Sequence, residues 1–312
     1  MKKNTLSVVI VNFNTRELLK NCLESIFKQE TSFELEIIVV DNGSTDGSVG
    51  YLKSQKSKVK AKVQNVKLGK ERKQFVNSAT RQPDQLDQPD QPDKPNNLIT
   101  IFNSKNFGFA KANNQAIKKS KGEWVFLLNS DTIVKRDALE KLVAFAWKGN
   151  GVGAVAPMLL NFDGSVQPSC YHSLSALTAF KEFWLGKAGA FSKYALEDGL
   201  AVEVEAAVGA ALLLPKRIID KVGLLNEKYF MYFEDLDYCR KIRQSGFKVF
   251  YLPEAKIVHL HGQSGKKLDD KPNRWLIESS KKYYGSLNYY LINFIIWSGQ
   301  KWQRLRKFLS PR

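Results

Sequence analysis

Carboxylate and amide side chains follow three mainly apolar runs of the sequence, and they are the first candidates for chemistry. The runs LSVVIV, LEIIVV and WVFLL end at Asn12, Asp41 and Asn129, and the third continues into Ser130 and Asp131. Carboxylates suit hard divalent cations such as Mg²⁺ and Mn²⁺. Asp131 is therefore a candidate metal ligand, and the alternative is that it caps the following turn.

A second concentration of acids lies in YFEDLDYCRKI, which contains Glu234, Asp235 and Asp237. Carboxylates can take part in proton transfer, but acids in the first turn of a helix are also explained by its dipole. Two of the three histidines, His259 and His261, are two residues apart. In a strand both side chains would project to the same face.

These residues need a scaffold, and the pattern around them alternates between strand and helix. Apolar runs indicate strands at 6–12, 35–41, 98–103 and 123–129, and 3.6-residue periodicity indicates helices at 15–29 and 108–120, with Thr15 as a plausible cap for the first. Near-continuous Val, Ile and Leu in the strands is typical of a parallel sheet covered on both faces. The sequence therefore predicts an α/β fold whose mainly parallel sheet brings the three polar strand ends to one cleft.

The cleft lacks the usual phosphate-binding loops. VNFNTRE stands where a dinucleotide enzyme would have G-x-G-x-x-G, and there is no P-loop lysine motif. A divalent cation held by Asp131 would supply another means of binding phosphate.

The net charge of +17 is concentrated in two segments. Residues 53–73 contain nine basic residues and one acid, and residues 266–312 contain eleven basic and three acidic residues. The first segment runs into RQPDQLDQPDQPDKPNN, whose proline and polar content predicts a disordered insertion at about 54–97. No nucleic-acid-binding motif accompanies the charge, so nucleic acid is not an expected partner.

The C-terminal segment 266–312 is predicted to be a basic, aromatic helical tail. LNYYLINFIIW is too short to span a membrane, and KWQRLRKFLSPR interleaves basic and apolar residues. This pattern suits a helix on an anionic membrane surface, and packing on the domain or on a partner subunit explains it equally well. Three separated cysteines and no cleavable signal predict a cytoplasmic protein, peripheral at the inner face of the plasma membrane if the tail binds lipid.

Seven motifs occur in an order that resembles glycosyltransferase family 2, and most closely its bacterial rhamnosyltransferase-like members. The similarity covers about residues 6–265, interrupted by the insertion, and predicts a catalytic domain at 1–265. The motifs are SVVIVNFN, IIVVDNGSTDGS, NFGFAKANN, GEWVFLLNSDT, GAALLLPK, YFEDLDYCRKIRQSGFKVFYLP and VHLHGQS.

The resemblance implies a GT-A fold, with a mixed, mainly parallel sheet and helices on both faces. It also implies inverting transfer of a sugar from a nucleoside diphosphate sugar, with Mg²⁺ or Mn²⁺ as cofactor. Asp131 matches the last position of the family's D-x-D-like motif, whose first acid is here Asn129. His259 matches the H-x-x-G-x-S motif together with Gly262 and Ser264, which implies contact with the metal or the diphosphate.

The resemblance also implies roles for other residues. Asp235 is expected to be the catalytic base, with Glu234 as the second candidate, and Gly209 and Ala210 are expected at the acceptor. The Trp that commonly precedes this G-A pair is absent, and Ala206 and Ala207 stand there instead. The residues expected to bind the nucleotide sugar are Phe13, Asn14, Asp41, Asn42, Asn106, Gly108, Asn113, Asn129 and Ser130.

The expected acceptor is a hydroxyl of a cell-surface glycan or a lipid-linked glycan, and rhamnose is the donor sugar that the subgroup favours. The substitution of Asn129 for an acid leaves an alternative open, in which the chain is a non-catalytic module that binds sugar nucleotides. A sugar-nucleotide pyrophosphorylase is disfavoured because its glycine-rich, basic N-terminal loop is missing.

Overall fold

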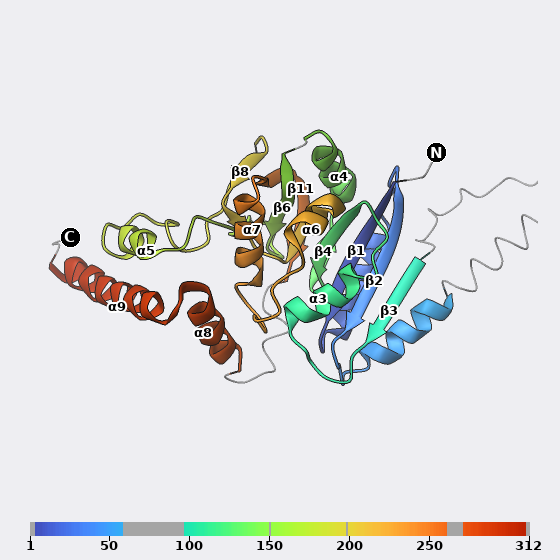
Figure 1. Cartoon of the computed structure of the whole chain (residues 1–312), viewed down its shortest axis with the longest axis horizontal. Helices are drawn as coiled ribbons and strands as arrows, with labels where there is room; N and C mark the ends of the chain where they lie inside the picture. The colour runs from blue at the N-terminus through green and yellow to red at the C-terminus, as the bar shows by residue number, and fades with distance from the viewer. Residues whose placement is uncertain (1–3, 59–96, 150, 198, 261–270, 310–312) are drawn as a thin grey trace, which may run out of the picture.

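A central β-sheet organises the computed structural model, which describes residues 4–58, 97–149, 151–197, 199–260 and 271–309 (Figure 1). The strands are β1 (Thr5–Asn12), β2 (Glu34–Asp41), β3 (Asn97–Phe102), β4 (Trp124–Asn129), β5 (Thr132–Val134), β6 (Val152–Leu160), β7 (Cys170–Tyr171), β8 (Val202–Val204), β9 (Ala206–Ala207), β10 (Ala211–Pro215) and β11 (Lys248–His259). Nine of them form one sheet in the order β3-β2-β1-β4-β10-β6-β11-β5, with β8 paired to β11. The other two, β7 and β9, pair with each other.

Helices cover the sheet and extend beyond it. They are α1 (Arg16–Phe27), α3 (Phe109–Ile117), α4 (Ala138–Trp147), α5 (Ala176–Phe183), α6 (Lys216–Val222), α7 (Glu234–Gln244), α8 (Lys271–Tyr284) and α9 (Ser286–Leu309), with a further helix at 48–58. Most of the predicted 54–97 insertion lies outside the described residues.

The N-terminal half is the predicted parallel sheet. β1 pairs in parallel with β2 and β4, and β2 pairs in parallel with β3. The pairing direction changes at β4, whose other neighbour, β10, is antiparallel. The prediction of a mixed, mainly parallel α/β sheet is confirmed.

β4 is buried on both faces, which explains its unbroken apolar run. Trp124, Phe126 and Leu128 join the core on the face covered by α1 and α4, whereas Val125 and Leu127 join the core on the face of α3, α6 and α7. Successive side chains of a strand point to opposite faces, so a strand between two helix layers requires apolar residues at every position. Apolar burial of this kind dominates the stability of the fold.

The side chain of Thr15, after β1, does not cap α1 as the sequence predicts. Thr15 occupies the N-cap position of α1, but its side chain makes no capping hydrogen bond. Its hydroxyl instead donates to Asn12 Oδ1 at 2.7 Å and lies 2.9 Å from Ser130 Oγ. A local bond to the end of β1 and a tertiary contact with the residue after β4 therefore take the place of the capping bond.

The C-terminal helices pack on the rest of the protein in two places. Ser279 of α8 donates to the carbonyl of Met231 at 2.7 Å. α9 runs beside α5 (Figure 1), where Trp184 Nε1 donates to the carbonyl of Ile295 at 3.2 Å. Gly299 permits this approach, because a Cβ there would lie 2.7 Å from the Phe183 carbonyl oxygen. The predicted helical tail is thus partly built into the fold.

Neither α9 nor any other helix in the described part of the chain has the length and apolar character needed to span a membrane. The three cysteines are buried and unpaired.

Candidate active site

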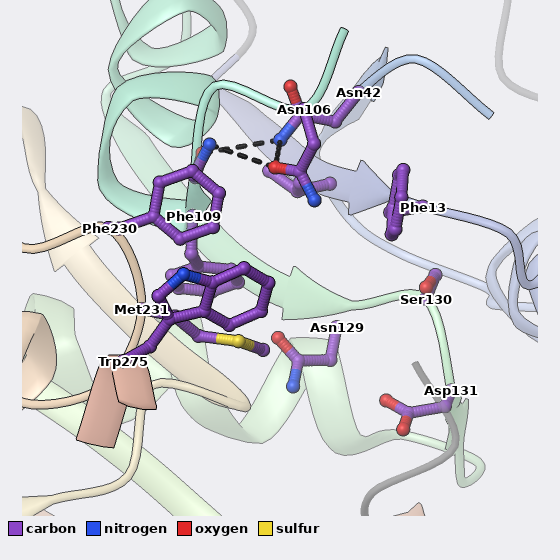
Figure 2. Close-up of a pocket in the computed structure, with 12 residues that line it drawn as sticks. Phe13, Asn42, Asn106, Phe109, Asn129, Ser130, Asp131, Phe230, Met231 and Trp275 are labelled. Carbon is purple, nitrogen blue, oxygen red and sulfur yellow. Dashed lines mark hydrogen bonds between the residues drawn. The ribbon is translucent and has the colours of Figure 1, made fainter. Parts of the chain in front are cut away.

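A pocket opens where β1 and β4 end (Figure 2). Val11 of β1 lies opposite Asn129 of β4 in the parallel pairing, so the polar residues that follow both strands reach the same point. Seven residues predicted to bind a sugar nucleotide or a metal line this pocket: Phe13, Asn42, Asn106, Gly108, Asn129, Ser130 and Asp131. The structure therefore brings the three polar strand ends together.

The opposite wall of the pocket is apolar, and the sequence analysis did not select it. Phe109, Phe230, Met231 and Trp275 form this wall, and the rings of Phe230 and Trp275 are 4.5 Å apart. Trp275 belongs to α8, beyond the boundary predicted at residue 265. No local motif marks it, because only the packing of α8 brings it to the pocket.

Asparagine side chains shape the edge of the pocket. Asn42 Nδ2 donates to Asn106 Oδ1 at 2.9 Å, as Figure 2 shows. Asn42 Oδ1 accepts from Asn103 Nδ2 at 3.0 Å and from the backbone N–H of Phe107 at 3.1 Å. Asn106 Oδ1 also accepts from the N–H of Gly108 at 2.9 Å. These bonds fix the turn before α3 without the help of a ligand.

Gly108 sets the distance between the two walls. Its φ of 90° lies in the region that favours glycine, and a Cβ would stand 2.6 Å from the carbonyl oxygen of Phe230. The same carbonyl accepts a hydrogen bond from Phe109 N at 2.7 Å. A side chain at position 108 would therefore force the walls apart.

Three residues predicted to bind the nucleotide do not line the pocket. The buried Asp41 carboxylate accepts from Asn12 Nδ2 and from Ser44 N, each at 2.9 Å, and so holds the turn after β2. Asn14 Oδ1 accepts from Thr45 N at 2.8 Å, and the buried Asn113 donates to the Phe109 carbonyl within α3 at 3.0 Å. Their visible partners are structural, and their contact with a nucleotide stays a prediction.

Two residues predicted to hold a metal lie side by side. His259 Nε2 is 3.5 Å from Asp131 Oδ1, and both side chains are 6% exposed. The antiparallel pairing of β11 with β5 produces this contact, because His259 lies opposite Thr132, the residue after Asp131. His259 Nδ1 lies 2.7 Å from Gln167 Oε1, which fixes the ring orientation. Gly262 and Ser264, the other members of the predicted motif, lie outside the described residues.

The donor set fits a divalent cation that also binds a diphosphate. Within the described ranges no group of three or more His, Cys, Asp or Glu residues could hold a metal, so Asp131 and His259 would be two protein ligands completed by phosphate and water. Asn129 Oδ1, two residues before Asp131, is buried without a hydrogen-bond partner. An unsatisfied buried acceptor costs free energy, and a cation or a ligand N–H or O–H group would satisfy it.

The predicted base stands at the N-terminus of α7. Asp235 accepts hydrogen bonds from Gly209 N at 2.9 Å and from Leu236 N at 2.8 Å. Burial raises the pKa of the Asp235 carboxyl, and these two N–H groups and the charge of Lys193 partly oppose that rise. A raised pKa suits a carboxylate that must accept a proton near neutral pH.

Glu234 has a different environment. Its side chain is buried, and Oε2 has no hydrogen-bond partner. Burial, and then the charge of Asp235, raise the pKa of Glu234 well above its ordinary value. The half-buried Asp235 is therefore better placed than Glu234 to meet an acceptor.

A short backbone segment joins the base to the pocket. The carbonyl of Ala210 accepts from Asn129 N at 2.8 Å, and the adjacent Gly209 N–H donates to Asp235. The Gly209 Cα carries no side chain, and a Cβ there would lie 3.2 Å from the Asp235 Cβ. The two residues predicted at the acceptor thus connect the metal-binding side of the site to the base.

Lys193 and Tyr171 complete the surroundings of Asp235, and the sequence analysis missed both. The Lys193 ammonium lies 5.9 Å from the centre of the Tyr171 ring. Burial lowers the pKa of Lys193, and Asp235 opposes that shift. Burial and then the Asp235 charge raise the pKa of Tyr171. Only the folded structure places these residues near the base, since each lies at least 42 positions away along the chain.

The mixed sheet and the pocket at its switch in pairing direction define the GT-A class of fold. The mannosyltransferase PcManGT from Pyrobaculum calidifontis, solved in complex with GDP-Man and Mn²⁺, has this fold. It is 15% identical to the present protein with a TM-score of 0.57, and the match covers 100% of this chain and 77% of that one.

The sequence comparison gives the family. The family model described as "Glycosyltransferase like family 2" matches residues 90–277, and "Glycosyl transferase family 2" matches residues 7–83. The chain belongs to glycosyltransferase family 2, which confirms the resemblance seen in the motifs.

Two relatives show how far the similarity extends. The N-acetylglucosaminyl-diphospho-decaprenol L-rhamnosyltransferase of Mycobacterium tuberculosis is 25% identical over 82% of this chain and 76% of its own length. An uncharacterized protein, y4gI, from Sinorhizobium fredii is 25% identical over 86% of this chain. The match spans only 26% of y4gI.

Proposed function

We propose that this protein transfers a sugar, with inversion, from a nucleoside diphosphate sugar to a hydroxyl group of an acceptor. The observation that carries this proposal is the arrangement of Asp131 beside His259 at one end of the site and Asp235 at the other, joined through Ala210 and Gly209. The pocket between β1 and β4 would receive the donor. Its volume of about 80 Å³ is below the roughly 300 Å³ or more of typical ligand sites, so the donor would extend into the open cleft.

Asp235 would act as the general base. It would take the proton of the acceptor hydroxyl while that oxygen bonds to the anomeric carbon of the donor, and the bond from this carbon to the diphosphate oxygen would break on the opposite face. The N–H groups of Gly209 and Leu236 hold the carboxylate in place for this proton transfer. A single displacement of this kind inverts the anomeric configuration.

Asp131 and His259 would hold Mg²⁺ or Mn²⁺, with Asn129 beside them. A bound divalent ion supplies positive charge that stabilises the departing diphosphate. Gln167 would keep the His259 ring oriented through its contact with Nδ1.

Rhamnose is the proposed donor sugar, and a lipid-linked glycan is the proposed acceptor class. Both follow from similarity to the M. tuberculosis rhamnosyltransferase, whose name specifies a diphospho-decaprenol acceptor. A cell-surface glycan hydroxyl is the broader acceptor class.

An anionic membrane would be the setting for such an acceptor, and α9 is the surface that suits it. Large apolar side chains are exposed along this helix, among them Phe294 at 62% and Trp297 at 58%. Lys301, Arg304 and Arg306 follow in the same helix and are exposed. An apolar face with neighbouring cations favours adsorption to an anionic bilayer.

The test is a nucleotide-sugar screen by thermal shift with and without Mn²⁺, followed by mass spectrometry of the products. We expect a stabilising donor, because a ligand that binds the native state raises Tm, and we expect transfer or slow donor hydrolysis. Asp131→Ala should lose the stabilisation by the donor and the transfer or hydrolysis of the donor. Asp163→Ala, at an exposed turn, is the matched control. Donor binding with neither transfer nor hydrolysis would favour the alternative, a non-catalytic sugar-nucleotide-binding module.

A further inference from the structure

A second cavity is lined by residues of α7, α8 and α9. It has a volume of about 370 Å³ and lies between residues 173–176, α7 and the corner where α8 meets α9. We call it the tyrosine cavity. Its polar lining consists of Ser173, Ser175, Arg240, Tyr283, Tyr284 and Asn288.

The helix α8 links the tyrosine cavity to the donor pocket. Trp275 lines the donor pocket, and Tyr283 lines the tyrosine cavity eight residues later. At 1.5 Å per residue, the two positions are about 12 Å apart along the helix. The two sites therefore adjoin the same helix at positions about two turns apart.

The tyrosine cavity also adjoins the base. The rings of Tyr283 and Tyr284 pack on Phe233, with centroids 5.2 Å and 5.6 Å away. Phe233 directly precedes Glu234 and Asp235, and its φ of 67° turns the chain into α7. A ligand against the two tyrosines would therefore lie beside the segment that carries the base.

The electrostatics of the tyrosine cavity favour an anion. Among the residues that the structure describes, Arg240 is the one charged residue that lines this cavity, and none of the described acids lines it. Arg240 donates to the buried Asp237 at 2.7 Å and lies 4.4 Å from the centre of the Tyr283 ring, which fixes the guanidinium while its side chain stays 39% exposed. A guanidinium has five N–H donors and binds phosphate well, so Arg240 retains donors for a ligand, and hydroxyl and amide groups surround it.

Apolar side chains also line the tyrosine cavity or lie near its lining in the sequence. Leu174 and Ile292 belong to its lining, and the exposed side chains of Leu177 on α5 and Leu291 on α9 lie close to them in sequence. α5 and α9 run side by side away from the sheet (Figure 1). A ligand with an anionic head and a hydrocarbon chain matches this sequence of polar and apolar surface.

We propose that the tyrosine cavity binds the diphosphate of a lipid-linked glycosyl acceptor, with Arg240 as the phosphate-binding residue and the hydrocarbon chain lying over α5 and α9. The inference rests on the proposed function, because the sugar next to the diphosphate would then present its hydroxyl to Asp235. Anionic phospholipid headgroups share the same phosphate chemistry, and the experiment separates the two sources.

The test uses the full chain and farnesyl diphosphate as the probe, with farnesol as the probe that lacks phosphate. Isothermal titration should show that Arg240→Gln weakens farnesyl diphosphate binding by about tenfold or more, which is the expected loss of a charge-assisted hydrogen bond. Arg240→Lys should restore part of the affinity. Arg243→Gln is the matched control, because Arg243 lies on α7 and pairs with Glu205 outside the tyrosine cavity.

A second variant guards against misfolding. Asn288 is exposed, and Asn288→Asp would place a negative charge at the tyrosine cavity. This variant should therefore also bind farnesyl diphosphate more weakly than wild type. Unchanged affinity in both Arg240→Gln and Asn288→Asp would overturn the proposal, as would equal binding of farnesol and farnesyl diphosphate. If Arg240→Gln also weakens binding to phosphatidylglycerol vesicles, Arg240 binds bilayer headgroups. That result would overturn the proposal too.

The two proposals fail separately. Titration of UDP, GDP and dTDP with Mn²⁺ reports on the donor pocket alone. If the protein binds nucleotide but Arg240→Gln does not change the affinity for farnesyl diphosphate, the proposed function stands and the acceptor site is rejected. A wild-type protein that binds no nucleotide would reject the proposed function, whatever the probe does.

Discussion

Replacing Asp235 by Asn separates its chemical role from its effect on the fold. The amide has nearly the same shape, and its oxygen can still accept one of the two N–H bonds from Gly209 and Leu236. It cannot accept the acceptor proton. General-base catalysis contributes about 10²- to 10⁴-fold to rate, so we expect kcat to fall by about that factor. Nucleotide affinity should stay nearly constant, because Asp235 does not line the donor pocket.

The same substitution changes the pH dependence of stability. The folded-state pKa values of Asp235 and Glu234 are raised by burial. A raised pKa means that the folded state binds protons more tightly than the unfolded state, so stability is highest below the unfolded pKa values, about 4. That stability is lost as pH rises through the folded pKa values. Asp235→Asn removes one of these two groups and the repulsion between them. The difference between the Tm of the variant and the Tm of wild type should therefore increase from pH 5 to pH 8.

The assay measures transfer by mass spectrometry between pH 5 and pH 9 and thermal unfolding over the same range. Wild-type kcat should rise with pH as Asp235 loses its proton, and the residual rate of the variant should lack that step. Asp220→Asn, at a surface position of α6 that pairs with Lys216, is the matched control and should change neither quantity. A variant that keeps kcat within about tenfold of wild type would exclude Asp235 as the base. A Tm difference that is independent of pH would refute the electrostatic argument.

Three further variants test other parts of the structure. Asp131→Ala should abolish the Mn²⁺-dependent rise in Tm that a nucleotide produces, and a full rise in the variant would remove Asp131 from the metal site. Gly108→Ala should lower the free energy of unfolding by about 1–3 kcal/mol, because of the positive φ and the contact with the Phe230 carbonyl. Thermal unfolding would detect this as a Tm lower by about 2–4 °C per kcal/mol. An unchanged Tm would contradict this prediction. Phe294→Asp should reduce partition onto phosphatidylglycerol vesicles by about tenfold, because the variant loses one exposed aromatic side chain that would enter the bilayer surface. Leu200→Asp, at an exposed position outside α5 and α9, is its control, and an equal loss in both variants would exclude α9 as a specific docking face.

The strands of the parallel half could be predicted because their information is local. β1, β2 and β4 each consist of an apolar run that two helix layers bury, and each ends at a polar residue that parallel pairing brings to the same edge. Asn129 and Asp131 could be placed at the pocket on this argument alone. The pairing of His259 with Asp131 required the family motif, because β11 and β5 are far apart in the sequence.

The apolar wall of the donor pocket and the tyrosine cavity could not be predicted. Trp275 and Tyr283 belong to a helix of mixed polarity, and their position depends on how α8 packs against residues 230–233. The prediction for Thr15 was wrong for a related reason. Its hydroxyl donates to Asn12 at the end of β1 and contacts Ser130 after β4, and helix propensity does not take the second, tertiary contact into account.

The link between Asn129 and Asp235 uses main-chain atoms of residues 209 and 210. Main-chain atoms are present whatever the neighbouring side chains are, provided that position 209 stays small. The side chains around this link can therefore diverge during evolution while the spacing between the two halves of the site is inherited. Ala206 and Ala207 form β9 and precede this link, so directed evolution of acceptor preference could begin on that strand without moving the base.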